Sequence, residues 1–275
     1  MKNSARRIRD PRMLLACAWA AGTLLLALGG CAGAGGQHAP QQDMVTESDE
    51  PEARKRARIR MELAVGYFEQ GKTDIALDEL KQVIASDPTF PDAYNLRGLI
   101  YMRLNDLRQA EDSFRHAAAL NPRDGNVQHN WGWLLCQQGR YDESFRAFDA
   151  ALANPLYAGR AKTLMTLGLC QARAGKTAEA EKSLARSYEL DAGNPVTGYN
   201  LAILLYRRGD YSHAQFYIRR LNNSELANAE TLWLGVKVER RLGDRVALQQ
   251  LGETLRKRFP QSREATAYER GAFDD

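Results

Sequence analysis

The sequence is poor in the residues and motifs that catalytic and metal sites require. Its 275 residues include four histidines and four cysteines, which are scattered along the chain. It contains no Gly-x-Ser-x-Gly nucleophile motif, no His-Glu-x-x-His zinc motif and no dinucleotide-binding fingerprint. We therefore expect a protein that is not an enzyme and that uses no cofactor, no metal and no small-molecule substrate.

The sequence also lacks an apolar run long enough to cross a membrane. Residues 13–28 are apolar over about 16 positions and follow a cationic leader, whereas a transmembrane helix needs ~20 residues. This pattern predicts a secretory signal peptide over residues 1–30. Its end, Leu28-Gly29-Gly30-Cys31, resembles the bacterial lipoprotein box. The resemblance implies cleavage before Cys31 and acylation of that residue; the alternative is a plain signal peptide or an uncleaved anchor.

A concentrated basic surface is missing as well. The formal net charge is +4, but residues 1–30 hold five of the 38 basic and one of the 34 acidic residues, so the rest of the chain carries 33 of each. Nucleic acid requires a basic surface, so we expect no nucleic-acid partner. The local cluster Arg54 to Arg58 is interpreted as a solvated helix start, with contact to anionic lipid or peptidoglycan as the alternative.

The segment after Cys31 has almost no large apolar side chain. Residues 32–51 are rich in Gly, Gln, Asp, Glu, Ser and Pro, a composition that cannot bury enough surface to offset the entropy of ordering. We predict that residues 31–56 form the lipidated N-terminus and a flexible tether. About 20 residues give an average reach of about 25 Å, which would keep the folded part close to the membrane.

The rest of the chain has an internal repeat. A turn residue follows an apolar segment at six positions, spaced by 34, 34, 36, 34 and 34 residues. These positions are Gly71, Asn105, Gly139, Gly175, Gly209 and Gly243. A period of this size indicates a solenoid of helix pairs.

Small residues recur on both sides of each turn. Gly98, Gly132 and Gly168 lie seven residues before a turn, and Ala110 and Ala180 lie five residues after one. Two helices cross closely only where side chains are small, so these positions mark the crossing within each pair. The pattern resembles the tetratricopeptide repeat, and the alternative is an irregular helical bundle.

We therefore predict an all-α fold, a right-handed superhelical solenoid of six tetratricopeptide repeats over residues 57–262. The repeats are placed at 57–90, 91–124, 125–160, 161–194, 195–228 and 229–262, and residues 263–275 are predicted to form a short cap or tail. The two extra residues between the third and fourth repeats fall near Pro155 to Gly159 and predict a longer helix or loop there.

First helices line the concave side of such an array, which suggests a groove for a protein partner. Asparagine amides would fix the backbone of an extended peptide or helix, and large side chains would supply contact area. The alternative is that these side chains pack between repeats. The predicted groove residues are Asn95, Leu99, Met102, Asn130, Trp133, Tyr199, Ile203 and Tyr206.

Two cysteines fall on neighbouring first helices of the predicted array. Cys136 is at position twelve of the third repeat and Cys170 is at position ten of the fourth. Packed helices lie ~8–10 Å apart on axis, and side chains that face each other can bring α-carbons within the ~7 Å that a disulfide requires. We predict a Cys136–Cys170 disulfide; two buried free thiols are the alternative.

Several stretches resemble one family more specifically than the repeat consensus does. Residues 92–104, 118–122, 129–136 and 153–157 are similar to the PilF/PilW family of type IV pilus biogenesis lipoproteins. The segment His129-Asn130-Trp131-Gly132-Trp133-Leu134-Leu135-Cys136 carries the resemblance best.

The resemblance implies a pilotin, a lipoprotein that helps the type IV pilus secretin to reach the outer membrane and to form its ring. It implies a lipid anchor in the outer membrane, facing the periplasm, and Ala32 rather than Asp after Cys31 agrees with that sorting. The secretin subunit is then the expected partner. Two alternatives are another envelope lipoprotein adaptor, for outer-membrane protein assembly or cell-wall synthesis, and the recognition arm of an enzyme.

Overall fold

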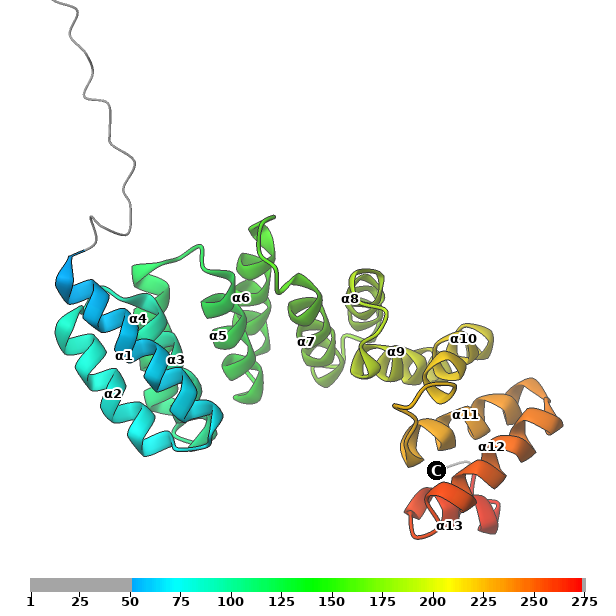
Figure 1. The fold of residues 1–275 in the computed structure, drawn as a ribbon. Coiled ribbons are helices and arrows are strands. Elements are labelled where there is room, and N and C mark those ends of the chain that lie inside the picture. Colours follow the sequence, from blue (N-terminus) through cyan, green and yellow to red (C-terminus); the bar gives the residue numbers. More distant parts are fainter. Residues whose placement is uncertain (1–50, 274–275) are drawn as a thin grey trace, which may run out of the picture. The chain divides into compact units, whose positions relative to one another are not determined.

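The computed structural model describes residues 51–273, which fold as an array of helices (Figure 1). Cys31, the predicted signal peptide and most of the predicted tether lie outside these residues. Within the described range there are helices and turns but no strand. The helices form six pairs. The first helices of the pairs are α1 (Glu52–Glu69), α3 (Pro91–Arg103), α5 (Gly125–Gln137), α7 (Arg160–Arg173), α9 (Pro195–Arg208) and α11 (Ala229–Leu242). The second helices are α2 (Thr73–Ser86), α4 (Leu107–Leu120), α6 (Tyr141–Ala153), α8 (Thr177–Leu190), α10 (Tyr211–Asn222) and α12 (Arg245–Arg258), and α13 (Arg263–Arg270) follows them.

The six predicted turn residues join the two helices of each pair. All six have left-handed backbone conformations, with φ between 60° and 88°. Five are glycine, which adopts this conformation without strain, and the sixth is Asn105, a residue type that tolerates it. The residue after each turn donates a backbone hydrogen bond to a carbonyl five residues earlier, as Arg140 does to Leu135 at 2.9 Å. This motif caps the first helix and fixes the reversal of the chain.

The two helices of each pair cross at small residues of the first helix. A β-carbon on Gly98 would lie 2.5 Å from Cε1 of Phe114, and one on Gly132 would lie 2.9 Å from Cδ1 of Phe148. Ser144 Oγ donates a hydrogen bond to the Gly132 carbonyl at 2.7 Å. The glycines of first helices therefore accept a large side chain of the second helix, whereas the sequence pattern suggested that small residues face each other.

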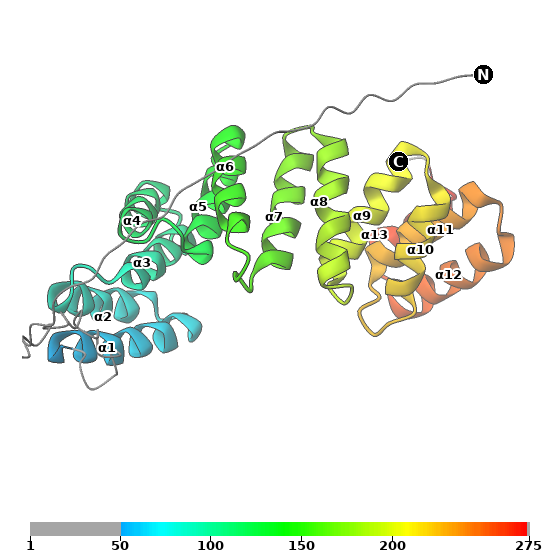
Figure 2. The ribbon, with the colours of Figure 1, turned by 90° about the horizontal axis from the view of Figure 1, so that it is seen from above.

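Consecutive pairs are joined mainly through the first helix of the following pair, which packs against both helices of the preceding pair. Each second helix packs against the next first helix, and each first helix packs against the next first helix. Second helices meet through long side chains, as Tyr188 of α8 does with Tyr217 of α10, with ring centroids 4.9 Å apart. The first helices therefore form one continuous inner face, and the second helices line the outside. Figure 2 shows the pairs following one another in chain order. This arrangement is the predicted all-α tetratricopeptide superhelix.

The first helix begins earlier than the sequence analysis placed it. Residues 52–56, assigned there to the tether, form the first turns of α1. Pro51 precedes the helix and Glu52 lies in its first turn, both of which favour a helix start. Arg54 adds tertiary contacts, since it pairs with Asp87 and lies over the ring of Phe90 at 4.9 Å.

The extra residues between the third and fourth repeats form a loop. It spans residues 154–159, between α6 and α7, and neither helix is lengthened. Tyr157 is buried, with its ring where β-carbons on Gly125 and Gly159 would lie. The loop therefore closes the junction of the two repeats with a buried aromatic ring.

Candidate functional site

All eight predicted groove residues lie on first helices and are half-buried. Leu99 and Met102 pack against the cluster that contains Phe114, and Trp133 packs against the cluster of the two cysteines. Tyr199, Ile203 and Tyr206 pack against the core of the fourth to sixth pairs. Each of these side chains therefore contributes to packing between repeats and also leaves part of its surface on the inner face.

The two predicted asparagines lie side by side on neighbouring first helices. Nδ2 of Asn130 donates a hydrogen bond to Oδ1 of Asn95 at 3.0 Å. This contact joins α3 to α5 and fixes both amides. An amide has two donors and two lone pairs on its oxygen, so both side chains retain hydrogen-bonding capacity for a peptide backbone.

Cations lie over aromatic rings along the same face. Arg103 of α3 lies 4.0 Å from the ring centroid of Phe68 on α1, and Arg173 of α7 lies 5.0 Å from that of Trp133 on α5. Lys237 of α11 lies 5.7 Å from the ring of Tyr206 on α9. In each case the cation comes from the following first helix. These three contacts, which we call the ring–cation pairs, present an aromatic surface beside a positive charge.

The sequence analysis identified Trp133 and Tyr206 but missed the cations that cover them. Arg103 and Arg173 each lie two residues before a turn residue, and this recurrence was the available signal. Lys237, which covers Tyr206, lies six residues before its turn residue and had no such signal. Trp233 on α11 was missed as well. It lies ten residues before Gly243, as Asn95 and Tyr199 do before their turns.

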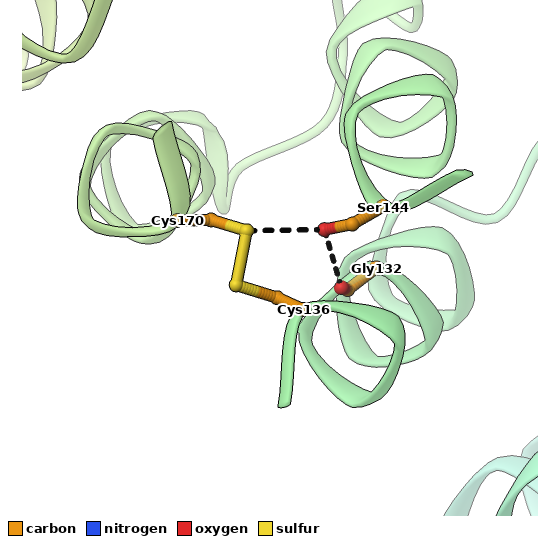
Figure 3. Close-up of a disulfide and its surroundings, with 4 residues drawn as sticks. All are labelled: Gly132, Cys136, Ser144 and Cys170. Carbon is orange, nitrogen blue, oxygen red and sulfur yellow. Dashed lines mark hydrogen bonds between the residues drawn. A yellow bond between two sulfur atoms is a disulfide. The ribbon is translucent and has the colours of Figure 1, made fainter. Parts of the chain in front are cut away.

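The two cysteines are bonded across α5 and α7. The structure contains a Cys136–Cys170 disulfide with α-carbons 6.0 Å apart, and the exposed fractions of the two residues are 3% and 0%. Figure 3 shows the bond between the two helices, with Ser144 Oγ 3.5 Å from Sγ of Cys170. The bond holds together the two first helices beside Trp133.

A buried histidine lies close to the same junction. His129 is 5% exposed, and its Nδ1 is 2.9 Å from Oγ1 of Thr163, whose hydroxyl also donates to the Tyr157 hydroxyl at 3.2 Å. Burial, with a smaller contribution from the charge of Lys162, lowers the pKa of His129 to about 4. The imidazole is therefore neutral at neutral pH and links α5 to α7 and the loop.

One stretch has the spacing of a phosphate-binding loop without its structure. Gly66, Gly71, Lys72 and Thr73 match Gly-x-x-x-x-Gly-Lys-Thr, a motif that functions between a strand and a helix N-terminus. Here Gly66 lies inside α1, so its backbone N–H belongs to the helix, and Lys72 Nζ donates to Gln70 Oε1 at 2.8 Å. The match does not form a phosphate site.

Within residues 51–273 no group of three or more His, Cys, Asp or Glu side chains is placed to hold a metal ion. In the same range no helix is both long and apolar enough to cross a membrane. The inner face offers surfaces for a polypeptide, namely amides, aromatic rings and cations.

Comparison with known proteins agrees with this geometry. Tetratricopeptide-repeat family models match residues 66–105, 91–124 and 129–195. The fold and its inner face define a tetratricopeptide-repeat scaffold of the class that binds protein partners.

Proteins of pilus assembly are similar over most of the chain. The type IV pilus assembly protein PilF of Pseudomonas aeruginosa is 28% identical over 247 residues, which cover 89% of this chain and 95% of PilF. A solved structure of Pseudomonas aeruginosa PilF has a TM-score of 0.73 at 25% identity, covering 80% of this chain and all of that one. The crystal structure of PilW, a type IV pilus biogenesis factor, has a TM-score of 0.68 at 30% identity and covers 77% of this chain and 97% of that one. The chain belongs to this PilF/PilW family of type IV pilus biogenesis proteins.

Proposed function

We propose that this protein is a pilotin: an outer-membrane lipoprotein that assists the type IV pilus secretin to reach the outer membrane and to multimerise. The observation that carries the proposal is the match to a type IV pilus assembly protein over 95% of that protein's length. The protein acts as a scaffold and not as an enzyme, with the inner face of the first helices as its binding surface.

The sequence of the N-terminus supports the location. Leu28-Gly29-Gly30-Cys31 has the form of a lipoprotein box, and Ala32 follows the cysteine. Acylated Cys31 would anchor the chain in the inner leaflet of the outer membrane, with the helical array in the periplasm. A short tether would keep that array near the membrane in which the secretin ring forms.

The inner face supports a polypeptide partner. Asn95 and Asn130 offer amide groups to a peptide backbone, and Leu99 and Trp133 offer apolar area beside them. Amides that are already fixed by a mutual hydrogen bond lose less freedom when a partner binds, which favours affinity.

The test is the amount of secretin multimer, measured by gel, in a strain that lacks this gene and carries a variant copy. We expect no multimer without the gene and full recovery with the wild-type chain. Asn95→Ala, Leu99→Ala and Trp133→Ala should each lower the multimer while the helical circular dichroism of the purified protein stays unchanged.

The matched control is Lys182→Ala on the exposed side of α8, which should restore the multimer fully. Normal secretin multimers in the strain without the gene would reject the proposal. Loss of helical signal together with loss of multimer, in all three groove variants, would assign those side chains to packing alone.

A further inference from the structure

The chain places one of its own aromatic residues on the inner face. Phe273 stacks on Trp233 with ring centroids 5.5 Å apart and an interplanar angle of 24°. Arg240 lies 4.5 Å from the ring of Phe273, and Tyr268 meets that ring edge-on at 6.3 Å. The ring of Phe273 therefore contacts both the ring of Trp233 and the guanidinium of Arg240, and both of these residues belong to α11.

The path of the chain explains this contact. Helix α13 contacts α11 and α12, and so takes the place that the first helix of a seventh pair would have. It ends at Gly271, which has a φ of 65° like the other turn residues. After Gly271, Ala272 donates its N–H to the Ala267 carbonyl at 2.9 Å, and Phe273 lies back over α11.

Trp233 and Arg240 occupy inner-face positions of α11. Trp233 lies ten residues before its turn residue, the position of Asn95 and Tyr199, and Arg240 lies three before, the position of Met102 and Tyr206. Lys237, between them, lies 5.6 Å from the ring of Trp233 and also covers Tyr206. Phe273 thus covers the last segment of the surface that holds the ring–cation pairs.

The edge of this face nearer the turns is basic. Basic residues occur two or three positions before the turns: Arg103, Arg173, Arg207, Arg240 and Arg241. Burial raises the pKa of Tyr199, the charges of Glu230 and Glu264 add to this, and the charge of Arg207 opposes it. A segment that binds along the face would meet positive charge at the edge nearer the turns.

We propose that the inner face binds a polypeptide segment that carries an aromatic residue next to carboxylates. The aromatic ring stacks on a ring of the inner face beside a cation, and the carboxylates point to the basic edge. The chain's own Phe273, which the sequence continues with Asp274 and Asp275, takes such a place in cis, on Trp233 and beside Arg240. This inference rests on the proposed function, in which the inner face binds the partner, and names the chemistry of the segment bound.

The test is fluorescence anisotropy with a labelled ten-residue probe, Gly-Ala-Phe-Asp-Asp repeated twice, titrated with the purified full chain in detergent. The tail competes with the probe at an effective concentration in the millimolar range. We therefore expect Phe273→Ala to bind the probe at least about fivefold more tightly than the wild-type chain does. The double variant Phe273→Ala/Arg240→Glu should lose this gain.

Three controls make the result specific. Arg186→Glu, an equal charge reversal on the exposed side of α8, should leave the gain from Phe273→Ala in place. A probe with Ala for Phe, and a probe with Asn for Asp, should each bind at least about tenfold more weakly, because the stacking contact or the charge contacts are lost. Circular dichroism checks that each variant is folded.

Equal affinity of the wild-type chain and Phe273→Ala would overturn the inference, and so would equal binding of the probe without phenylalanine. The secretin assay distinguishes the two proposals. If the chain does not bind the probe but Leu99→Ala lowers the amount of secretin multimer, the proposed function stands and this inference is rejected. Probe binding without any effect on secretin would keep the binding chemistry and reject the secretin as partner.

Discussion

At the scale of single residues, Gly98 and Gly132 determine how closely the helices of a pair approach. The ring of Phe114 lies where a β-carbon on Gly98 would be, with three ring atoms within 2.7 Å of that position. Gly66, on α1, has no atom within 4 Å of its missing β-carbon. Gly98 and Gly66 therefore offer a matched pair for measuring the free-energy cost of adding a β-carbon at the helix crossing.

Gly98→Ala should lower the free energy of unfolding by about 1–2 kcal/mol, because overpacking exceeds the gain in helix propensity. Gly66→Ala should raise it by about 0.5–1 kcal/mol, because the propensity gain is not opposed by a clash. Urea unfolding followed by circular dichroism measures both. A Gly98→Ala variant as stable as the wild type would show that the ring of Phe114 moves aside freely.

His129 makes stability depend on pH. Its pKa is lowered by burial to about 4, whereas an unfolded histidine titrates near 6.5, so the unfolded state binds the proton first. Stability is therefore complete above about pH 6.5 and falls as the pH drops toward 4. From pH 7 to pH 4.5 the histidine should cost about 2.5 kcal/mol of unfolding free energy.

Urea unfolding at the two pH values measures this loss, and His129→Gln should reduce it by most of that amount. An identical pH dependence in the wild type and His129→Gln would contradict the assignment to this side chain.

At the scale of elements, side-chain contacts and a disulfide join the third and fourth pairs. The loop of residues 154–159 lengthens the connection, Tyr157 fills it, and His129 and Thr163 bridge α5 and α7. The Cys136–Cys170 bond joins the same two helices. A connection that is two residues longer gives the two pairs more conformational freedom relative to one another. The contacts and the disulfide restrict that freedom.

The disulfide closes a loop of 34 residues, so the chain-entropy model predicts a stabilisation of about 3–4 kcal/mol. Cys136→Ser/Cys170→Ser should lose about that amount in urea unfolding under non-reducing conditions. Intact-mass measurement of protein purified without reductant should find neither cysteine alkylated unless the sample is reduced first. Two alkylated thiols without reduction would contradict the bond.

A second element-scale feature is a buried carboxylate that joins the fifth and sixth pairs. Glu239 on α11 is 0% exposed, and both its oxygens accept from Arg219 of α10, at 2.7 Å and 3.0 Å. Gln215 donates to the same carboxylate at 2.7 Å, and the Glu239 carboxylate raises the pKa of Arg219. The pairing satisfies a charge that burial would otherwise make costly.

Arg219→Ala should lower the free energy of unfolding by about 3 kcal/mol, because it leaves this carboxylate buried without its cation. The double variant Arg219→Ala/Glu239→Leu should recover much of the loss, since the uncompensated charge is gone. Urea unfolding of the two variants distinguishes the cost of an unpaired charge from the loss of the contact itself. Equal stability of both variants would contradict this account.

At the scale of the whole molecule, the proposed anchor connects the array to a membrane. Cys31→Ala should move the protein to the soluble periplasmic fraction or leave it as an uncut precursor, because the thiol that would carry the lipid is removed. Membrane fractionation and immunoblotting of cells that express the variant measure this. Unchanged outer-membrane fractionation of Cys31→Ala would contradict the lipid anchor.

The order and type of the helices followed from the sequence because they depend on local and periodic features. A glycine or asparagine that must adopt a left-handed conformation recurs at six turns, and proline begins α3 and α9. The start of α1 could be read only in part. Pro51 and Glu52 favour a helix start, but the contacts of Arg54 with Asp87 and Phe90, at the end of the first repeat, are tertiary.

The inner-face residues could be predicted from the sequence only in part, for a similar reason. Leu99, Trp133 and Tyr206 stand out by residue type and register on one helix. The cations that cover the rings come from a neighbouring helix about 34 residues away, and an exposed arginine in a sequence looks the same whether it faces solvent or a ring.

By itself, the sequence determined that this protein is an array of helix pairs, because a 34-residue period and its turn residues depend on the chain's own backbone and spacing. Only the tertiary structure decided which side chains meet: Asn95 with Asn130, Arg173 with Trp133, and Phe273 with Trp233. These contacts depend on how one helix is rotated and translated against another. That choice is made by the packing of the whole pair, and no single segment of the sequence encodes it.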